Sequence, residues 1–186
     1  MAFLAHLWAP ILLSAVLVFL ASSLVHMVFK WHASDYGRLP DEEAVRTVLL
    51  KTPPAPGQYV LPHCADMKEM GSPDMVKRYE EGPVGVLTLK APGAPAMGPA
   101  LGAWFLFNLV VAFCVAYVAY HALPAGTPYL RVFQVTGAVC FLAYAAGAVP
   151  ASIWMGKPWR ITFKDLLDGL IYALVTAGAF GWLWPR

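Results

Sequence analysis

The chain has 186 residues, of which 59% are hydrophobic and only 13% charged, with a formal net charge of +2. An ordinary soluble domain has about 45–50% apolar and about 25% charged residues. A compact water-soluble fold is therefore excluded, and so is disorder. Seventeen of the 24 charged side chains lie between Lys30 and Lys90. The sequence predicts an integral membrane protein with one polar insert.

Four long stretches with few or no charges predict four transmembrane helices, because about 20 apolar residues are needed to cross a hydrocarbon core of about 30 Å. We expect these helices near residues 6–29, 101–123, 129–153 and 164–184. The seven tryptophans fall at or near the expected helix ends, where indole rings prefer to lie. The predicted fold is an all-α membrane protein, with a first helix in 1–30, a small α+β insert in 31–100 and three helices in 101–186.

Lysines and arginines near the helix ends predict the orientation, since cytoplasmic loops carry an excess of them. One side, with the insert and the 154–163 loop, carries seven of these residues, and the other side carries Arg131 and Arg186. The seven are Lys30, Arg38, Arg46, Lys90, Lys157, Arg160 and Lys164. We expect a multi-pass protein of a bacterial inner membrane with both termini outside; the inverted topology stays open. The first span lacks a basic leader and an A-x-A-like cleavage site, so it is expected to remain as an anchor.

Cap and turn residues predict a small fold within the insert. Helices are expected over 40–51 and 72–82, because each begins with an N-terminal proline and acidic residues and ends at a glycine or proline. Short strands are expected over 58–61 and 84–90. The chain has no nucleotide-binding glycine loop, zinc-type cysteine spacing or G-x-S-x-G elbow. We expect no nucleic-acid partner.

Small residues recur every four positions in the last two expected helices, which predicts a close helix–helix contact. The set is Ala143, Gly147 and Ala151 in the third helix and Gly169, Ala173, Ala177 and Gly181 in the fourth. Such a surface also suits docking to the helix of a partner. The expected partners are therefore the lipid bilayer and other membrane subunits, or a second copy of the chain.

The insert contains one set of soft metal ligands. If a short helix begins at Pro62, then His63, Met67 and Met70 lie at i, i+4 and i+7, with Cys64 beside them. Imidazole, thiolate and thioether groups together suit Cu(I). The alternative is that the two methionines form an apolar packing face.

The other histidines lie near the expected helix ends. His6 and His121 fall on the first two helices at the same side of the membrane, and two such histidines can ligate the iron of haem b. The alternative is that both are interfacial side chains. At the opposite side, His26 and His32 are expected to mark the membrane interface.

Asp165 and Asp168 lie three residues apart at the start of the fourth expected helix, where they complement its dipole. No acidic residue is expected at mid-membrane, which argues against a proton-driven pump. The leading hypothesis is a non-catalytic accessory or assembly subunit of a larger inner-membrane complex, without a cofactor. A Cu(I)-handling protein and a b-type haem protein are the two alternatives.

Overall fold

The computed structural model describes residues 2–186, which are mostly helical and form two compact units. One unit is helical and contains the chain up to Tyr36 together with residues 96–152 and 157–186. The other consists of Gly37–Pro95 and the short segment Ile153–Gly156. The first unit contains the apolar helices and the second contains the polar insert predicted from the sequence.

Three helical segments among the described residues are long and apolar enough to cross a membrane: Phe3–Phe29, Met97–Ala122 and Tyr129–Trp154. The first consists of α1 (Ala2–Ser23) and a π-helical turn, Leu24–Phe29. The second is α4 (Met97–Ala122). The third begins with α5 (Tyr129–Ala145) and continues through a 3-10 turn into α6 (Val149–Trp154). These segments confirm three of the four predicted helices as candidate spans.

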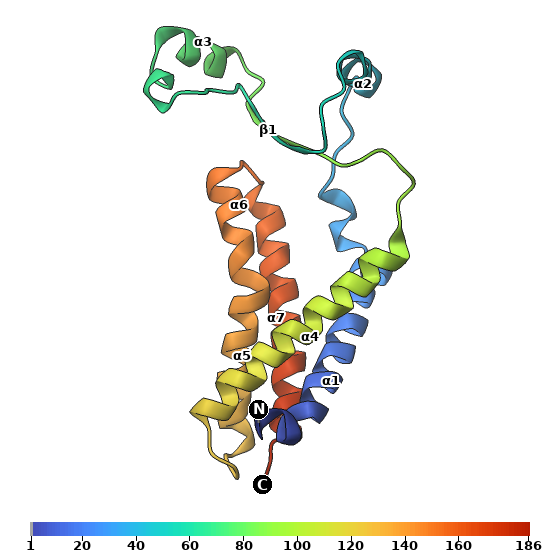
Figure 1. The fold of residues 1–186 in the computed structure, drawn as a ribbon, viewed down its shortest axis with the longest axis vertical. Coiled ribbons are helices and arrows are strands. Elements are labelled where there is room, and N and C mark those ends of the chain that lie inside the picture. The colour runs from blue at the N-terminus through green and yellow to red at the C-terminus, as the bar shows by residue number, and fades with distance from the viewer. Residues whose placement is uncertain (1) are drawn as a thin grey trace. The chain divides into compact units, whose positions relative to one another are not determined.

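The fourth predicted helix forms as α7 (Trp159–Trp182), but it is not among those three candidate spans. Its first ten residues contain four charged side chains, which lower its hydropathy: Arg160, Lys164, Asp165 and Asp168. In Figure 1 the long helices run alternately up and down, and both chain ends lie at the lower end of the helical unit.

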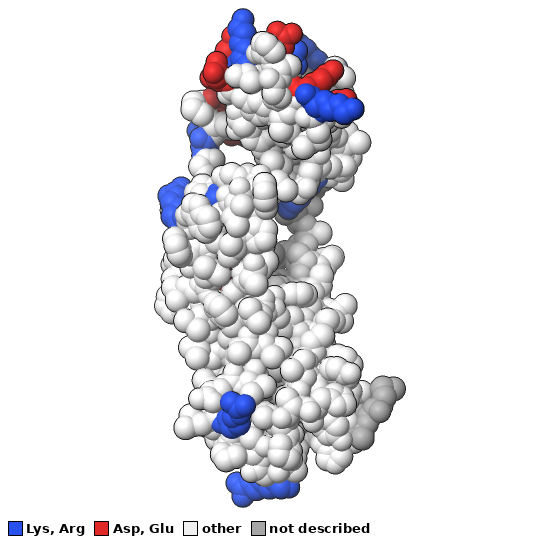
Figure 2. Space-filling model, turned by 90° about the vertical axis from the view of Figure 1, so that its left-hand side faces the viewer, with Lys and Arg blue, Asp and Glu red and all other residues white. Residues whose placement is uncertain are grey.

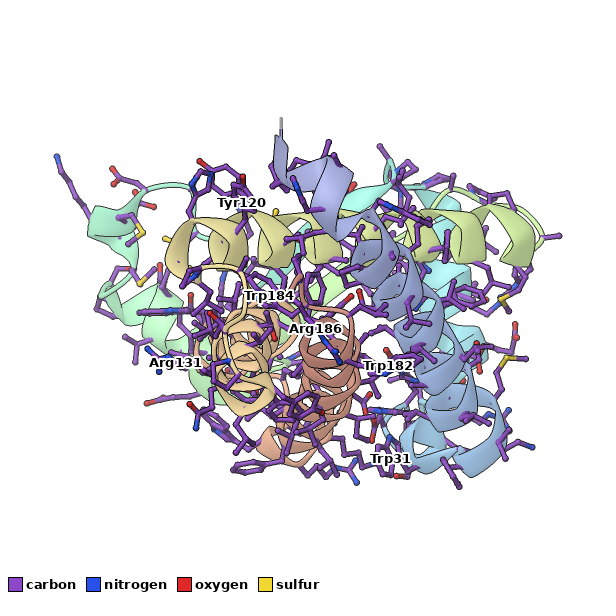
Figure 3. The ribbon with its side chains drawn as sticks, turned by 90° about the horizontal axis from the view of Figure 1, so that it is seen from below. Trp31, Tyr120, Arg131, Trp182, Trp184 and Arg186 are labelled. Carbon is purple, nitrogen blue, oxygen red and sulfur yellow. The ribbon has the colours of Figure 1, made fainter. Side chains whose placement is uncertain are left out.

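The hairpin between α4 and α5 contacts the C-terminal end of the chain. The Gly126 amide donates to the Pro185 carbonyl at 2.9 Å, and Trp184 Nε1 donates to the Pro124 carbonyl at 3.1 Å. Figure 3 views the helical unit from this end and labels Trp184, Arg186 and Arg131. The end of α7 and the α4–α5 hairpin are therefore joined at the same end of the helical unit.

One apolar core joins the four long helices. Leu7 from α1, Val115 from α4, Val132 from α5 and Phe180 from α7 are all fully buried within it. Since every helix contributes to the same core, the ends of these helices are held in fixed positions relative to one another.

Helices α5 and α7 approach closely along small residues of α7. A Cβ atom placed on Gly169 would lie 2.7 Å from the Cβ of Ala145, so no side chain fits between the two backbones. Ala173 and Ala177 are buried along the same contact, and Gly181 lies against the ring of Tyr129.

The expected α5 side of this contact is different. Ala143 and Gly147 are exposed and Ala151 is only half-buried. The α5 residues that lie against the glycines and alanines of α7 include Tyr129, Gly137 and Ala145. The 3-10 turn at 146–148 interrupts the α-helix, so the four-residue spacing does not continue along one face.

The insert contains the two helices and two strands that its cap and turn residues predict. Its helices are α2 (Glu42–Lys51) and α3 (Pro73–Glu81), capped by the side chains of Asp41 and Ser72. The strands β1 (Gly57–Leu61) and β2 (Gly85–Leu89) pair antiparallel, with Tyr59 opposite Leu87. Charged side chains gather on this unit, whereas the helical surface in view is largely uncharged (Figure 2). Met75 is the one buried side chain between Gly37 and Pro95, so the core of the insert is small.

Candidate metal centre

The chain that leaves α1 folds back against the start of α7. Lys30 adopts a left-handed conformation with φ of 52°, which ends the π-helical turn and redirects the backbone. A 3-10 turn follows at Trp31–Ser34. Lys164 of α7 binds this turn by donating to the Trp31 carbonyl at 2.6 Å and to Ser34 Oγ at 3.0 Å. These contacts fix the turn beside the first part of α7.

His32, within this turn, lies between two carboxylates. Its Nδ1 is 2.6 Å from Asp35 Oδ2, and its Nε2 is 2.8 Å from Asp168 Oδ2 on α7. His26 comes from the π-helical turn, and its Nε2 lies 3.6 Å from the same Asp168 oxygen. The two imidazole rings are 4.7 Å apart. Three segments therefore direct two imidazoles and one carboxylate to a common point.

The geometry of this cluster suits a small metal ion. The ligand atoms of His26, His32 and Asp168 all lie within 4.8 Å of one another, the one such group of three His, Cys, Asp or Glu side chains within residues 2–186. Zn²⁺ bonds of about 2.0–2.1 Å place adjacent ligand atoms about 2.9–3.4 Å apart, depending on the bond angle. The observed 2.8 Å and 3.6 Å lie on either side of this range. Small side-chain movements would thus bring Asp168 and each histidine to the separation of two ligands on one ion.

Asp35 lies where it can orient the His32 ring by accepting a hydrogen bond from Nδ1. A metal-bound histidine usually donates its second ring N–H to a carboxylate, which fixes the tautomer and the ring orientation. A proton on Nδ1 of His32 would be donated to Asp35, leaving the Nε2 lone pair for a metal ion. The hydrogen bond from Lys164 lowers the pKa of the Asp35 carboxyl below its ordinary value of 3.8, against the opposing effect of burial. Asp35 is therefore held as the anion that this role requires.

Asp168 is buried and incompletely paired. Its side chain is 8% exposed, and its Oδ1 atom has no hydrogen-bond partner among the described residues. A buried carboxylate oxygen without a partner is costly. A cation bound beside it would remove that cost. His26, by contrast, is half-exposed at 49% and gives access to the cluster.

The soft-ligand set of the insert does not lie on one helix. Strand β1 extends to Leu61, and only Met67–Glu69 forms a 3-10 turn, started by an Asp66 side chain that accepts from the Lys68 amide at 2.9 Å. His63, Met67 and Met70 are exposed, and Cys64 is half-buried with its thiol 3.0 Å from the Asp66 carbonyl. The expected helix over 62–71 is therefore wrong. Neither methionine forms the alternative packing face, and copper binding stays a prediction.

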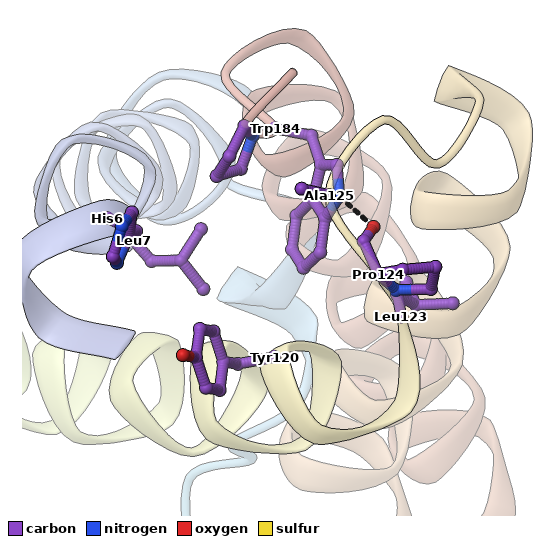
Figure 4. Close-up of a pocket in the computed structure, with 8 residues that line it drawn as sticks. His6, Leu7, Tyr120, Leu123, Pro124, Ala125 and Trp184 are labelled. Carbon is purple, nitrogen blue, oxygen red and sulfur yellow. Dashed lines mark hydrogen bonds between the residues drawn. The ribbon is translucent and has the colours of Figure 1, made fainter. Parts of the chain in front are cut away.

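The two histidines considered for haem lie near one tyrosine. His6 stacks on Tyr120 with ring centres 6.4 Å apart, and both line a pocket at the α4–α5 hairpin (Figure 4). His121 is not among the residues that line this pocket within the described chain; its ring packs against Tyr117 and Tyr120. The structure thus places both histidines among aromatic side chains, and haem binding stays a prediction.

The sequence alone placed His26 and His32 at the interface and Asp168 at a helix N-terminus, without joining them. His32 and Asp168 are separated by 136 residues, so no local spacing indicates their contact. Helix alternation does contain a signal, because in the predicted four-span arrangement the end of the first helix and the start of the fourth lie at the same side of the membrane. His26, His32 and Asp168 are all expected at that side, and three metal-ligating side chains at one side of the membrane indicate a candidate metal site.

No protein-family model matches the sequence, and comparisons with curated proteins and with solved structures find no significant match. The site is therefore interpreted from its own chemistry.

Proposed function

We propose that this chain is a multi-pass membrane protein that binds a divalent first-row transition-metal ion between His26, His32 and Asp168. The convergence of the three ligand atoms within 4.8 Å is the observation that supports it. Two imidazoles and one carboxylate are the ligand set of many Zn²⁺ and non-haem Fe²⁺ sites, in which the open positions bind water or a substrate.

The competing interpretation is a metal-free network that only fastens the 31–35 turn to α7. Lys164 already provides that fastening through the Trp31 carbonyl, Ser34 and Asp35. The network leaves the buried Asp168 Oδ1 unpaired, while the Nε2 atoms of both histidines lie near the Oδ2 atom of the same carboxylate. A cation held by both oxygens of Asp168 would pair Oδ1 and give the two imidazoles a common binding partner.

Metal titration of the purified protein tests the proposal. The wild type in mild detergent, stripped of metal and then equilibrated with Zn²⁺ or Co²⁺, should retain one ion per chain by elemental analysis. His32→Ala and Asp168→Asn remove a direct ligand, so they should weaken binding by more than the roughly 10–100-fold that follows loss of an outer-shell partner.

The matched control is His63→Ala, which removes an exposed histidine of the insert. It should leave the stoichiometry and affinity unchanged. Thermal unfolding of each variant separates loss of the site from loss of the fold. Stoichiometric binding that survives Asp168→Asn, or that disappears in His63→Ala, would contradict the assignment.

We also propose that α7 is a fourth membrane span, so that the chain forms a four-helix arrangement in a bacterial inner membrane with both termini outside. Two hydrogen bonds support it, because they join the end of α7 to the hairpin between candidate spans α4 and α5. The excess of basic residues at the opposite end of the helices supports this orientation.

The accessory or assembly role in a larger complex stays a prediction from the sequence. Mass spectrometry of chains that co-purify in mild detergent checks it. A protein that purifies alone with its metal ion would favour an independent metal-binding function.

A further inference from the structure

A cavity of about 420 Å³ opens beside the metal centre, and His26 belongs to both. Its lining comes from the end of α1, the π-helical turn and the start of α4: Ser22, Ser23, His26, Met27, Met97, Leu101 and Trp104. The volume is within the range of about 300–1,000 Å³ typical of small-molecule sites.

The cavity wall is held in place by a hydrogen bond between helices. Trp104 Nε1 donates to Ser22 Oγ at 2.8 Å, and Ser22 in turn donates to the Phe19 carbonyl at 2.9 Å. Trp104 also packs edge-on against Tyr172. The indole is therefore a fixed wall of the cavity.

The cavity is lined by both apolar and polar side chains. Met27 and Met97 are 66% and 67% exposed, although both belong to segments apolar enough to lie in a membrane. The half-exposed His26 imidazole, which also lines the cavity, contacts Asp168 and His32. The π-helical turn places His26 at this junction, and such turns occur frequently at functional sites. A ligand that fits both the apolar and the polar lining residues has an apolar chain and a polar head group.

We infer that this cavity holds the acyl chain of an amphiphilic ligand whose oxygen-bearing head group binds the metal ion beside His26, an inference that rests on the metal centre proposed above. The three protein ligands leave open coordination positions for such oxygen atoms. The apolar part of the lining suits an acyl chain, which needs no polar partner.

Alkyl hydroxamates test this directly, because their two oxygens chelate the metal while the length of their chain is varied. The Co²⁺-loaded protein is titrated in detergent with acetohydroxamate and with octanohydroxamate, and the visible absorption of Co²⁺ reports binding. The longer probe should bind about tenfold tighter or more, since a few buried methylene groups are sufficient for that gain.

Leu101→Trp fills the cavity, and Leu106→Trp is its control because Leu106 is exposed on the same helix outside the cavity. The gain from chain length should disappear in Leu101→Trp and remain in Leu106→Trp, with acetohydroxamate binding equally well to all three proteins. Met97→Trp is a second cavity-filling variant, and retained Co²⁺ binding shows that each variant is folded.

The outcomes separate the two proposals. A wild type that binds no Co²⁺ overturns the metal centre and this inference with it. The acyl-chain site alone is overturned if the protein binds Co²⁺ but its hydroxamate affinity does not depend on chain length. It is also overturned if that dependence is the same in Leu101→Trp and Leu106→Trp. A changed particle mass in Leu101→Trp without an effect on hydroxamate affinity would assign the cavity to a protein partner instead.

Discussion

Asp35 shows how much one side chain outside the proposed ligand set can contribute. It accepts from Lys164 on one side and faces His32 Nδ1 at 2.6 Å on the other. The carboxylate therefore couples the charge of Lys164 to the orientation of the imidazole. Removing its charge would weaken both interactions while leaving all three proposed ligands in the chain.

We expect Asp35→Asn to lower the metal affinity by about 10–100-fold, because the amide is a weaker acceptor for the imidazole N–H and leaves Lys164 uncompensated. A competition titration against a chelator of known affinity measures the change. Asp165→Asn is the control, since Asp165 lies on α7 three residues before the proposed ligand Asp168 but pairs with Lys157. Equal affinities for the Asp35 and Asp165 variants would show that Asp35 has no role in binding.

At the scale of the elements, the contact between α5 and α7 depends on the absence of side chains. Gly169 and Gly178 lie on the same helix but differ in their surroundings. A Cβ at Gly169 would lie 2.7 Å from the Cβ and 3.2 Å from backbone atoms of Ala145, whereas a Cβ at Gly178 would have its nearest neighbour, the Tyr129 hydroxyl, at 3.9 Å. The two glycines therefore form a matched pair.

Gly169→Ala should destabilise the protein, because forcing the helices apart costs about 1–3 kcal/mol and outweighs the gain of up to about 1 kcal/mol from the better helix propensity of alanine. Gly178→Ala obtains that gain without the strain, so it should be neutral or stabilising. Thermal unfolding in detergent compares the two. A Gly169→Ala protein as stable as the Gly178→Ala protein would contradict the close contact.

The elements were largely predictable because their signals are local. The caps at Asp41 and Ser72 locate both helices of the insert, and long uncharged runs locate the spans. The face of α5 that packs against α7 was not predictable, because an alanine-rich helix has small residues on several faces. Only the packing of α7 in the folded protein determines that Ala145 lies against Gly169. The metal-centre contact between His32 and Asp168 was likewise out of reach, because only the tertiary fold creates it.

For the whole molecule, the proposed orientation places the metal centre at the cytoplasmic side. The end of the helices that bears the metal centre carries four basic residues, Lys30, Lys157, Arg160 and Lys164, whereas the opposite end carries two, Arg131 and Arg186. Cytoplasmic loops are the ones enriched in lysine and arginine. An ion drawn from the cytoplasm would therefore reach His26 without crossing the bilayer.

Thiol labelling of intact spheroplasts with an impermeant maleimide tests this orientation and the fourth span together. The variants Ala125→Cys, in the exposed α4–α5 hairpin, and Arg186→Cys, after α7, are each made in a Cys64→Ser background. Both should be labelled from outside, because the Gly126–Pro185 hydrogen bond joins these two segments at one end of the helices. Cys64 of the wild type should react only after the membrane is permeabilised.

Two outcomes would contradict this topology. Labelling of Ala125→Cys without labelling of Arg186→Cys would show that α7 does not span the membrane. Labelling of Cys64 alone in intact spheroplasts would invert the orientation and place the metal centre outside.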